Sequence, residues 1–168
     1  AAPAVTEGLT TYRLSINMMY ASDRLSAVYG NNEATLSLEA PMGVFNSDMN
    51  ASWNASGVNP MLVASFPELA QDTYATVRLE GPASMSGLDG AADPSPVEDE
   101  AQPISPFFIA NGATSLLSNS VIGASWYVLN NASNAMADEN MQVLIAQITT
   151  EGALSGTINA QVFPLGVS

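Results

Sequence analysis

Paired carboxylates are the only catalytic device that this composition leaves fully open, because the sequence contains neither histidine nor cysteine. Their absence excludes thiol nucleophiles, serine–histidine pairs, and zinc or iron sites that need imidazole or thiolate ligands. A glycosidase needs only two carboxyl groups, one of which is held protonated by burial. The Asp and Glu residues fall mostly in turns and loops. We therefore expect solvated charges there, and no enzyme.

Calcium binding is a second use that the acidic residues could serve, since this ion takes roughly six to eight oxygen ligands. The segments "LDGAADPSPVEDE" and "NAMADEN" supply such oxygens, but neither has the spacing of an EF-hand loop. The alternative is that these charges only keep a neutral-surfaced protein in solution. No other cofactor is expected. The calcium candidates are Asp89, Asp93, Asp138 and Glu139.

Three acceptor sequons for N-glycosylation begin at Asn50, Asn54 and Asn131. The first two flank Trp53 in a long segment without periodicity, where we expect room for a glycan. Modification would require a secretory route, and the opening "AAPAVTEG" is typical of a chain that has lost a signal or transit segment. The alternative is chance occurrence in a chain rich in Asn and Ser.

Aromatic residues in or beside irregular segments form the last candidate site. They are Trp53, Phe45, Phe107 and Phe108. Such residues either present a flat apolar face to a sugar or close the open ends of a β-sandwich, and we favour closure. Carbohydrate binding or adhesion, with these aromatics and calcium, is therefore the alternative function.

The charge balance limits the partners that the protein can have. Three basic residues face 16 acidic ones, the net charge is −13, and there is no lysine. Such a surface repels phosphate backbones and anionic lipid, so we expect no nucleic acid partner and no membrane attachment. The sequence contains no run of about 20 apolar residues, so we expect no insertion into a membrane. Copies of the chain also repel one another, so self-association must use apolar and hydrogen-bonding contacts or bridging cations.

Alternation of apolar and polar residues predicts an all-β fold. It occurs in 12–18, 25–29 and 34–38, and the short turns between these segments predict a meander. "QVLIAQI" is nearly continuous in apolar character, which is typical of a central strand covered on both faces. Asn59 and Pro60 predict a short helical turn. We expect a single antiparallel β-sandwich of about eight or nine strands with one or two short helical turns.

The length of 168 residues predicts one domain, 1–168. A long acidic, proline-rich loop at about 81–106 is too poor in apolar residues to belong to its core. The segment "TTEGALSGTINAQVFPLG" at 149–166 predicts a hairpin that turns at Glu151-Gly152. Within it, Gly156 indicates a bulge or the close approach of another backbone.

Several segments together resemble a family of β-rich structural modules of marine algae and bacteria. They are "YRLSINMMYASDRLSAVYGN", "NPMLVASFPELAQDTYATVRLEGPAS", "GASWYVLNN" and "VLIAQITTEGALSGTINAQVFPLG". The layout is also similar to that of the diatom pyrenoid shell proteins, which tile into a sheet around Rubisco condensates. The resemblance implies a non-enzymatic module in which the Asn59-Pro60 turn and the terminal hairpin are framework. It supplies no catalytic residues.

These observations predict an acidic structural protein that self-assembles into a homo-oligomer, as a shell, sheath, tube or filament. Sheet edges expose unpaired backbone groups, and few charges are present to block them. The chain is shorter than the shell proteins and carries sequons. Both features favour an extracellular or cell-surface location for a glycoprotein, with the plastid, as in a pyrenoid shell, as the alternative.

Overall fold

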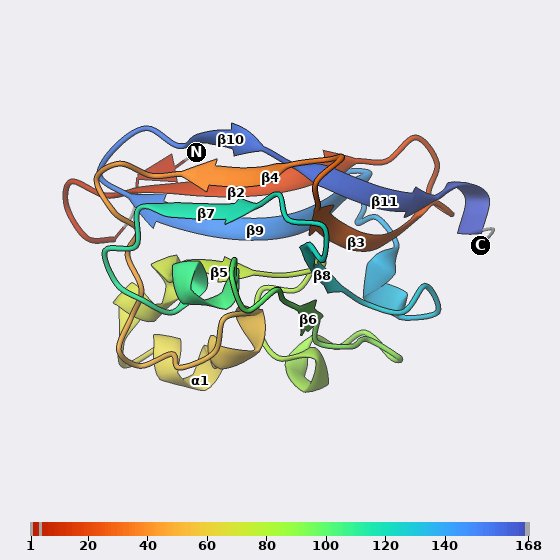
Figure 1. Cartoon of the computed structure of the whole chain (residues 1–168). Coiled ribbons are helices and arrows are strands. Elements are labelled where there is room, and N and C mark those ends of the chain that lie inside the picture. Colours follow the sequence, from red (N-terminus) through yellow and green to blue (C-terminus); the bar gives the residue numbers. More distant parts are fainter. Residues whose placement is uncertain (1, 4, 167–168) are drawn as a thin grey trace.

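The fold consists mostly of β-strands in three antiparallel sheets, as seen in a computed structural model that describes residues 2–3 and 5–166 (Figure 1). The all-β antiparallel class is thereby confirmed. The first sheet has the order β1 (Ala2–Pro3), β2 (Thr10–Asn17), β9 (Gln142–Thr150), β5 (Tyr74–Ala75). The second has the order β10 (Ser155–Thr157), β4 (Leu36–Glu39), β7 (Ser115–Ser118), and the third β11 (Asn159–Phe163), β3 (Arg24–Gly30), β8 (Ala124–Tyr127), β6 (Ser95–Val97).

Helix is confined to short turns in the described residues. They are α1 (Pro60–Val63), η1 (Ala55–Gly57), η2 (Pro67–Gln71), η3 (Ala83–Met85), η4 (Ser105–Phe108), η5 (Ser133–Ala135) and η6 (Pro164–Gly166). The turn expected at Asn59-Pro60 is confirmed as α1. Asn59 caps it, because its side chain accepts a hydrogen bond from the backbone N–H of Met61 at 2.9 Å.

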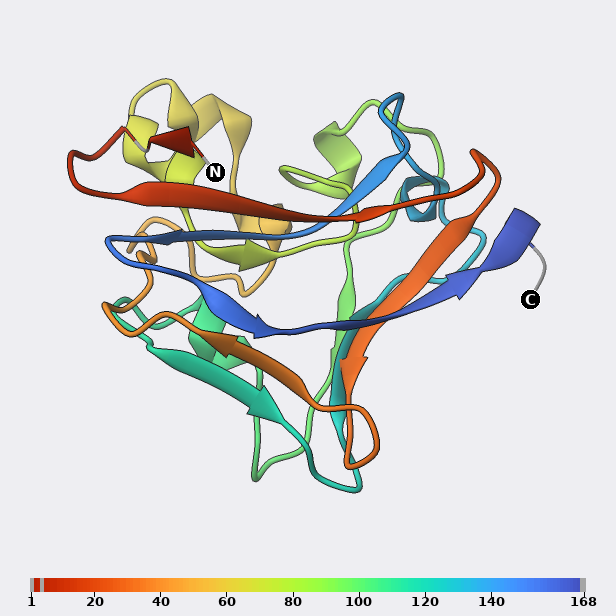
Figure 2. The same ribbon diagram turned by 90° about the horizontal axis from the view of Figure 1, so that it is seen from above.

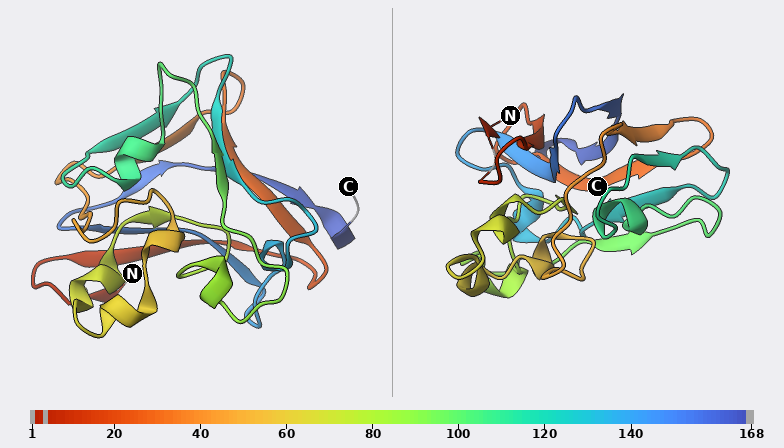
Figure 3. Two further views of the ribbon diagram at one scale, coloured as in Figure 1. Left: turned by 90° about the horizontal axis from the view of Figure 1, so that it is seen from below. Right: turned by 90° about the vertical axis from the view of Figure 1, so that its left-hand side faces the viewer.

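The three sheets surround one shared apolar core. From above and from below, the sheets lie along the sides of a triangle, with the core between them (Figure 2, Figure 3). Each sheet contributes buried residues, including Ile148 from β9, Leu38 from β4 and Trp126 from β8. Eleven strands lie in the described residues, more than the eight or nine expected, and a third sheet adds a wall to the two of a simple sandwich. The turns allow this by redirecting strands at the corners.

The predicted meander is wrong, because β2, β3 and β4 each belong to a different sheet. The corner between β3 and β4 shows why. The Asn31 side chain accepts hydrogen bonds from the backbone N–H groups of Glu33 and Ala34, which closes a turn without pairing the strands. A Cβ on Gly30 would lie 2.4 Å from the Cβ of Leu36, so the chain folds too tightly there for any side chain. Alternation predicts strands but does not predict their neighbours.

The strand expected to be central is confirmed as β9, which lies between β2 and β5. Eight of its nine residues are buried, all except Gln142. Its pairing with β2 shifts register between Leu14 and Ser15, which are opposite Ala146 and Leu144. This bulge leaves Ile145 as an extra residue and keeps apolar side chains directed to both faces.

The C-terminal segment is not a hairpin on β9, which corrects the prediction for 149–166. Instead β10 pairs with β4 and β11 pairs with β3, so one nearly continuous strand passes from the second sheet to the third (Figure 1). Asn159 holds the crossing point, because its amide nitrogen donates to the carbonyls of Tyr29, Ala34 and Thr35. The close approach expected at Gly156 is confirmed: a Cβ there would lie 2.1 Å from the carbonyl oxygen of Ser37.

The acidic, proline-rich segment at 81–106 belongs partly to the folded framework. Its β6 pairs with β8, and Ile104 is fully buried in the core, so the expectation that this segment lies outside the core is wrong for its second half. The side chain of Glu98 folds over the following turn and accepts hydrogen bonds from the backbone N–H groups of Ile104 and Ser105. A few anchoring groups thus order a segment that has little hydrophobic pattern.

Candidate functional site

The longest free sheet edge is formed by β10 and β11, and we call residues 155–163 the C-terminal edge. Both strands end their sheets, so their second backbone edge has no neighbouring strand in the described part of the chain. The C-terminal edge lies across the top of the molecule, whereas α1 lies at the bottom (Figure 1). Unpaired N–H and C=O groups along such an edge can accept another strand.

The composition of the C-terminal edge leaves it open to pairing with another strand. Natural edge strands are commonly blocked by lysine, proline or other charged residues. Residues 155–163 contain none of these, and no charged side chain occurs from Gly152 to Gly166. Behind the edge, Ile158, Ala160 and Val162 are partly buried against the core, which fixes the position of the strand. The C-terminal edge is therefore both ordered and open.

The other sheet edges are shorter or better protected. β6 spans three residues, one of which is Pro96. β5 spans two residues, and its Ala75 N–H donates to the carbonyl of Trp53, so a loop already covers it. β7 has four residues, and at its end Asn119 bonds the side chain of Gln102. The outer edge of β2 pairs with β1 at Thr10 and Thr11, and the rest of the strand includes the charged residue Arg13.

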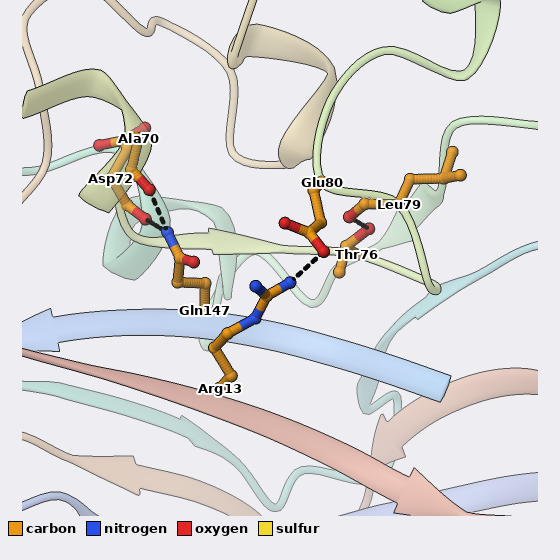
Figure 4. A network of polar contacts seen from close by, with 7 residues as sticks. All are labelled: Arg13, Ala70, Asp72, Thr76, Leu79, Glu80 and Gln147. Carbon is orange, nitrogen blue, oxygen red and sulfur yellow. Dashed lines mark hydrogen bonds and ion pairs between the residues drawn. The ribbon is translucent and has the colours of Figure 1, made fainter. Parts of the chain in front are cut away.

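A polar groove of about 490 Å³ lies on the face of the first sheet that points away from the shared core. Figure 4 shows Arg13 projecting from this face toward the loop that carries Glu80. The Nη2 atom of Arg13 lies 2.5 Å from the Oε1 atom of Glu80. Two of the protein's three arginines line this groove. We call it the arginine groove; its lining residues are Arg13, Ser15, Arg78, Glu80, Asp138, Asn140, Gln142 and Leu144.

The rim of the arginine groove holds an uncommon backbone conformation. Arg78 has a φ of 67° and Met141, in the turn beside Asn140, has a φ of 61°, a region that residues other than glycine seldom adopt. Tertiary contacts impose it: the Arg78 N–H donates to the carbonyl of Leu144 at 2.7 Å. Asp138 braces the opposite turn by accepting hydrogen bonds from the backbone N–H groups of Asn140 and Gln142.

Asp72 lies at the other end of the network in Figure 4 and is almost completely buried, with 1% of its surface exposed. Its carboxylate accepts hydrogen bonds from the backbone N–H of Ser47 and the side-chain nitrogen of Asn50. Its backbone carbonyl, with that of Ala70, accepts from the amide of Gln147. Burial raises the pKa of Asp72 to about 6, against the lowering effect of its hydrogen bonds.

We expect the protein to become more stable as the pH falls from 7 to 4.5. Because the pKa of Asp72 is higher in the folded state, the folded chain binds a proton more tightly between about pH 6 and pH 4, which adds about 2 kcal/mol. Below this window the trend reverses, since hydrogen bonds from the N–H of Leu165 and the hydroxyl of Ser120 lower the pKa values of Asp23 and Asp99.

Thermal unfolding between pH 3 and pH 8, followed by circular dichroism, measures this dependence. Asp72→Asn should remove the rise in Tm between pH 7 and pH 4.5. Asp48→Asn removes an exposed carboxylate and should keep the rise. An unchanged rise in Asp72→Asn would assign the effect to the release of general charge repulsion instead.

The calcium candidates do not come together. Asp89 and Asp93 line one hollow of the loop around η3, and the Asp93 carboxylate accepts a hydrogen bond from the N–H of Ala83. Asp138 lines the arginine groove, and Glu139 is exposed beside it. In residues 2–3 and 5–166 no three acidic side chains form a group that could hold a metal ion. Calcium binding stays a prediction.

The long loop that carries two sequons is tightly anchored. Asn50 and Asn54 are buried, and the side-chain nitrogen of Asn54 donates to the carbonyl of Pro94. Their side-chain oxygens accept from the backbone N–H groups of Ser52 and Ser56, replacing regular secondary structure. The room expected for a glycan at these two residues is therefore absent from the folded chain. Asn131 is exposed, and its modification stays a prediction.

The candidate aromatics are mostly internal. Phe107 and Phe108 are 2% and 1% exposed, so the prediction that they form a contact surface is wrong. Phe108 packs edge-on against Trp126, with ring centroids 5.7 Å apart, which closes the core as the favoured interpretation expected. Trp53 is partly buried against the core, and Phe45 lines a groove of about 350 Å³ beside Val44.

Comparison with known proteins gives no relative for this chain. No family model, no curated protein and no solved structure matches it. Within the residues that the structure describes, no helix combines the length and apolar character needed to cross a bilayer. A functional proposal therefore rests on the sequence, the fold and the two sites described above.

Proposed function

We propose that this protein is a non-enzymatic structural module that assembles with copies of itself into a shell, sheath, tube or filament. The C-terminal edge carries this proposal. It offers nine residues of strand backbone, free on one side in the described chain, without proline or charge. Addition of a strand from another copy would satisfy these backbone groups, each hydrogen bond contributing roughly 1 kcal/mol net.

Charge explains why copies would meet at this edge. Two molecules with a net charge of −13 repel one another at long range. The repulsion is smallest where both surfaces are neutral, and residues 152–166 form the neutral strip. Salt screens the remaining repulsion, since the Debye length falls to about 8 Å at physiological ionic strength. Assembly should therefore strengthen with added salt, opposite to an assembly held by ion pairs.

The resemblance to pyrenoid shell proteins supports the same proposal from a different direction, because those proteins tile into a sheet. We place the assembly outside the cell or at its surface, with the plastid as the alternative location. Immunogold labelling of the protein in sections of the source cell would separate the two compartments.

Charged substitutions on the C-terminal edge test the proposal. Gln161→Lys combined with Thr157→Lys places two charges on exposed side chains of β11 and β10. We expect wild-type protein at high concentration and in about 0.15 M salt to sediment as large assemblies, and to form sheets or filaments in electron micrographs. The double variant should sediment mainly as a monomer, because a desolvated lysine on a paired edge is costly.

A matched control separates the edge from general charge. Ala64→Lys with Ser84→Lys adds the same two charges at exposed positions on the α1 side of the molecule. Both double variants reduce the magnitude of the net negative charge from −13 to −11, so repulsion falls equally in each. Assembly lost only in the edge variant supports the proposal. Wild-type protein that sediments as a monomer at every salt and calcium concentration overturns it.

A further inference from the structure

We propose that the arginine groove binds a neutral polyhydroxylated ligand, such as a unit of an oligosaccharide. This site is separate from the C-terminal edge and does not depend on self-assembly. It also differs from the loop aromatics considered in the sequence, because none of the described residues that line it is aromatic. Its volume of about 490 Å³ lies within the range of roughly 300–1,000 Å³ that is usual for small-molecule sites.

The charges of the groove favour a neutral ligand. Arg13 and Arg78 supply two positive charges, and Glu80 and Asp138 supply two negative ones. Arg13 is already paired with Glu80. Hydrogen bonds from Gln142 and Asn140 lower the pKa of Asp138, and the charge of Arg78 adds to this. An anion would meet two carboxylates, and a cation would meet two guanidinium groups. A neutral ligand avoids both costs.

The hydrogen-bonding groups of the groove suit vicinal hydroxyls. Guanidinium, carboxylate and amide groups are planar and present two adjacent donors, two adjacent acceptors or one of each. Groups of this kind can engage two neighbouring hydroxyl groups of a sugar ring. Arg13 and Glu80 bond each other, and Arg78 donates to the carbonyl of Met136. Guanidinium and carboxylate groups nevertheless keep further donors and acceptors beyond these bonds. Gln142 donates its amide to Asn17 at 3.1 Å, and its carbonyl oxygen has no protein donor among the described residues. Most small-molecule sites are chiefly apolar, and a groove lined by so many polar groups suits a ligand rich in hydroxyls better than an apolar one.

The groove is also held in shape before any ligand arrives. Its floor is the paired β2 and β9, and its rim contains the constrained residues Arg78 and Met141. The Thr76 hydroxyl donates to the carbonyl of Leu79 at 2.6 Å and secures the loop that carries Glu80 (Figure 4). Positive φ at residues other than glycine costs energy and occurs preferentially at binding and active sites. Two of the three such residues in the described chain flank this groove.

Binding to defined oligosaccharides tests the inference. The probes are an array of neutral glucan, mannan and galactan oligosaccharides, with alginate and sulfated galactan oligosaccharides as anionic comparisons. Isothermal titration calorimetry then measures the affinity of each neutral binder. We expect Glu80→Gln and Gln142→Ala to weaken binding about tenfold or more, since each removes contacts to hydroxyl groups. Glu39→Gln removes a carboxylate from the exposed end of β4 and should leave affinity within about twofold.

Each outcome decides between sites. Neutral binders that weaken in both groove variants, but not in Glu39→Gln, support the inference. Binding of anionic oligosaccharides alone overturns it, as does the absence of any binding at millimolar ligand. Binding that is lost in Trp53→Ala and kept in Gln142→Ala would move the site to the aromatic loop. Thermal unfolding of every variant shows that it is folded. Sedimentation tests self-assembly independently, so either proposal can fail alone.

Discussion

Replacing Trp126 by alanine should lower the free energy of unfolding by about 3–5 kcal/mol, the range for removing a large buried aromatic side chain. Trp126 is completely buried in β8, at the point where the core meets η4. Its ring packs edge-on against Phe108, and its indole N–H donates to the carbonyl of Thr76 at 3.1 Å. The substitution therefore leaves a cavity and an unpaired carbonyl together.

Chemical denaturation followed by fluorescence measures this loss, because Trp53 remains as a probe. Trp126→Phe is the informative companion variant, since it keeps an aromatic ring beside Phe108 and removes only the indole N–H and some volume. We expect it to cost about 1–3 kcal/mol, the usual penalty for leaving a buried polar group unpaired. If both variants unfold like the wild type, Trp126 does not organise the core.

The strands of this fold could be predicted from local pattern, but their neighbours could not. The 12–18 alternation and the apolar run of β9 both reflect burial, which a sequence displays directly. The assignment of β2, β3 and β4 to three sheets depends instead on corners. Those corners rest on the side chain of Asn31 and on the absence of one at Gly30. A turn-forming sequence predicts a reversal, but not whether the reversal is a hairpin.

The candidate sites follow the same division. The sequence predicted a bulge or a close backbone approach at Gly156, and the close approach is the one that the structure shows. It did not predict the arginine groove, because Arg13 lies on β2 but Arg78 lies in a bend after β5, and nothing in the sequence brings the two together. Asp72 gave no signal, because its burial comes from Ser47 and Asn50, more than twenty residues away. Carboxylates in turns were expected to be exposed to solvent, whereas Asp72 is buried.

Replacing Gly156 by alanine should lower the free energy of unfolding by about 2–3 kcal/mol, as forced overpacking does. The new Cβ would lie 2.1 Å from the carbonyl oxygen of Ser37 and 3.1 Å from the Cα of Leu38. Both are backbone atoms of the β4 segment that pairs with β10, so no side-chain rotation can relieve the clash. Equilibrium denaturation measures the cost, and amide hydrogen exchange should show faster exchange in 155–157.

Gly87→Ala is the matched control for Gly156→Ala, because it isolates backbone conformation from contact. Gly87 has a φ of 73°, and a Cβ there would meet nothing within 4 Å. It should cost about 1 kcal/mol, the penalty for a side chain in the left-handed region. Equal costs for the two variants would contradict the close approach of β10 to β4. A larger loss of stability in Gly156→Ala, together with weaker assembly, would show that assembly depends on the packing of β10 against β4. A displaced strand cannot present an ordered backbone to another copy.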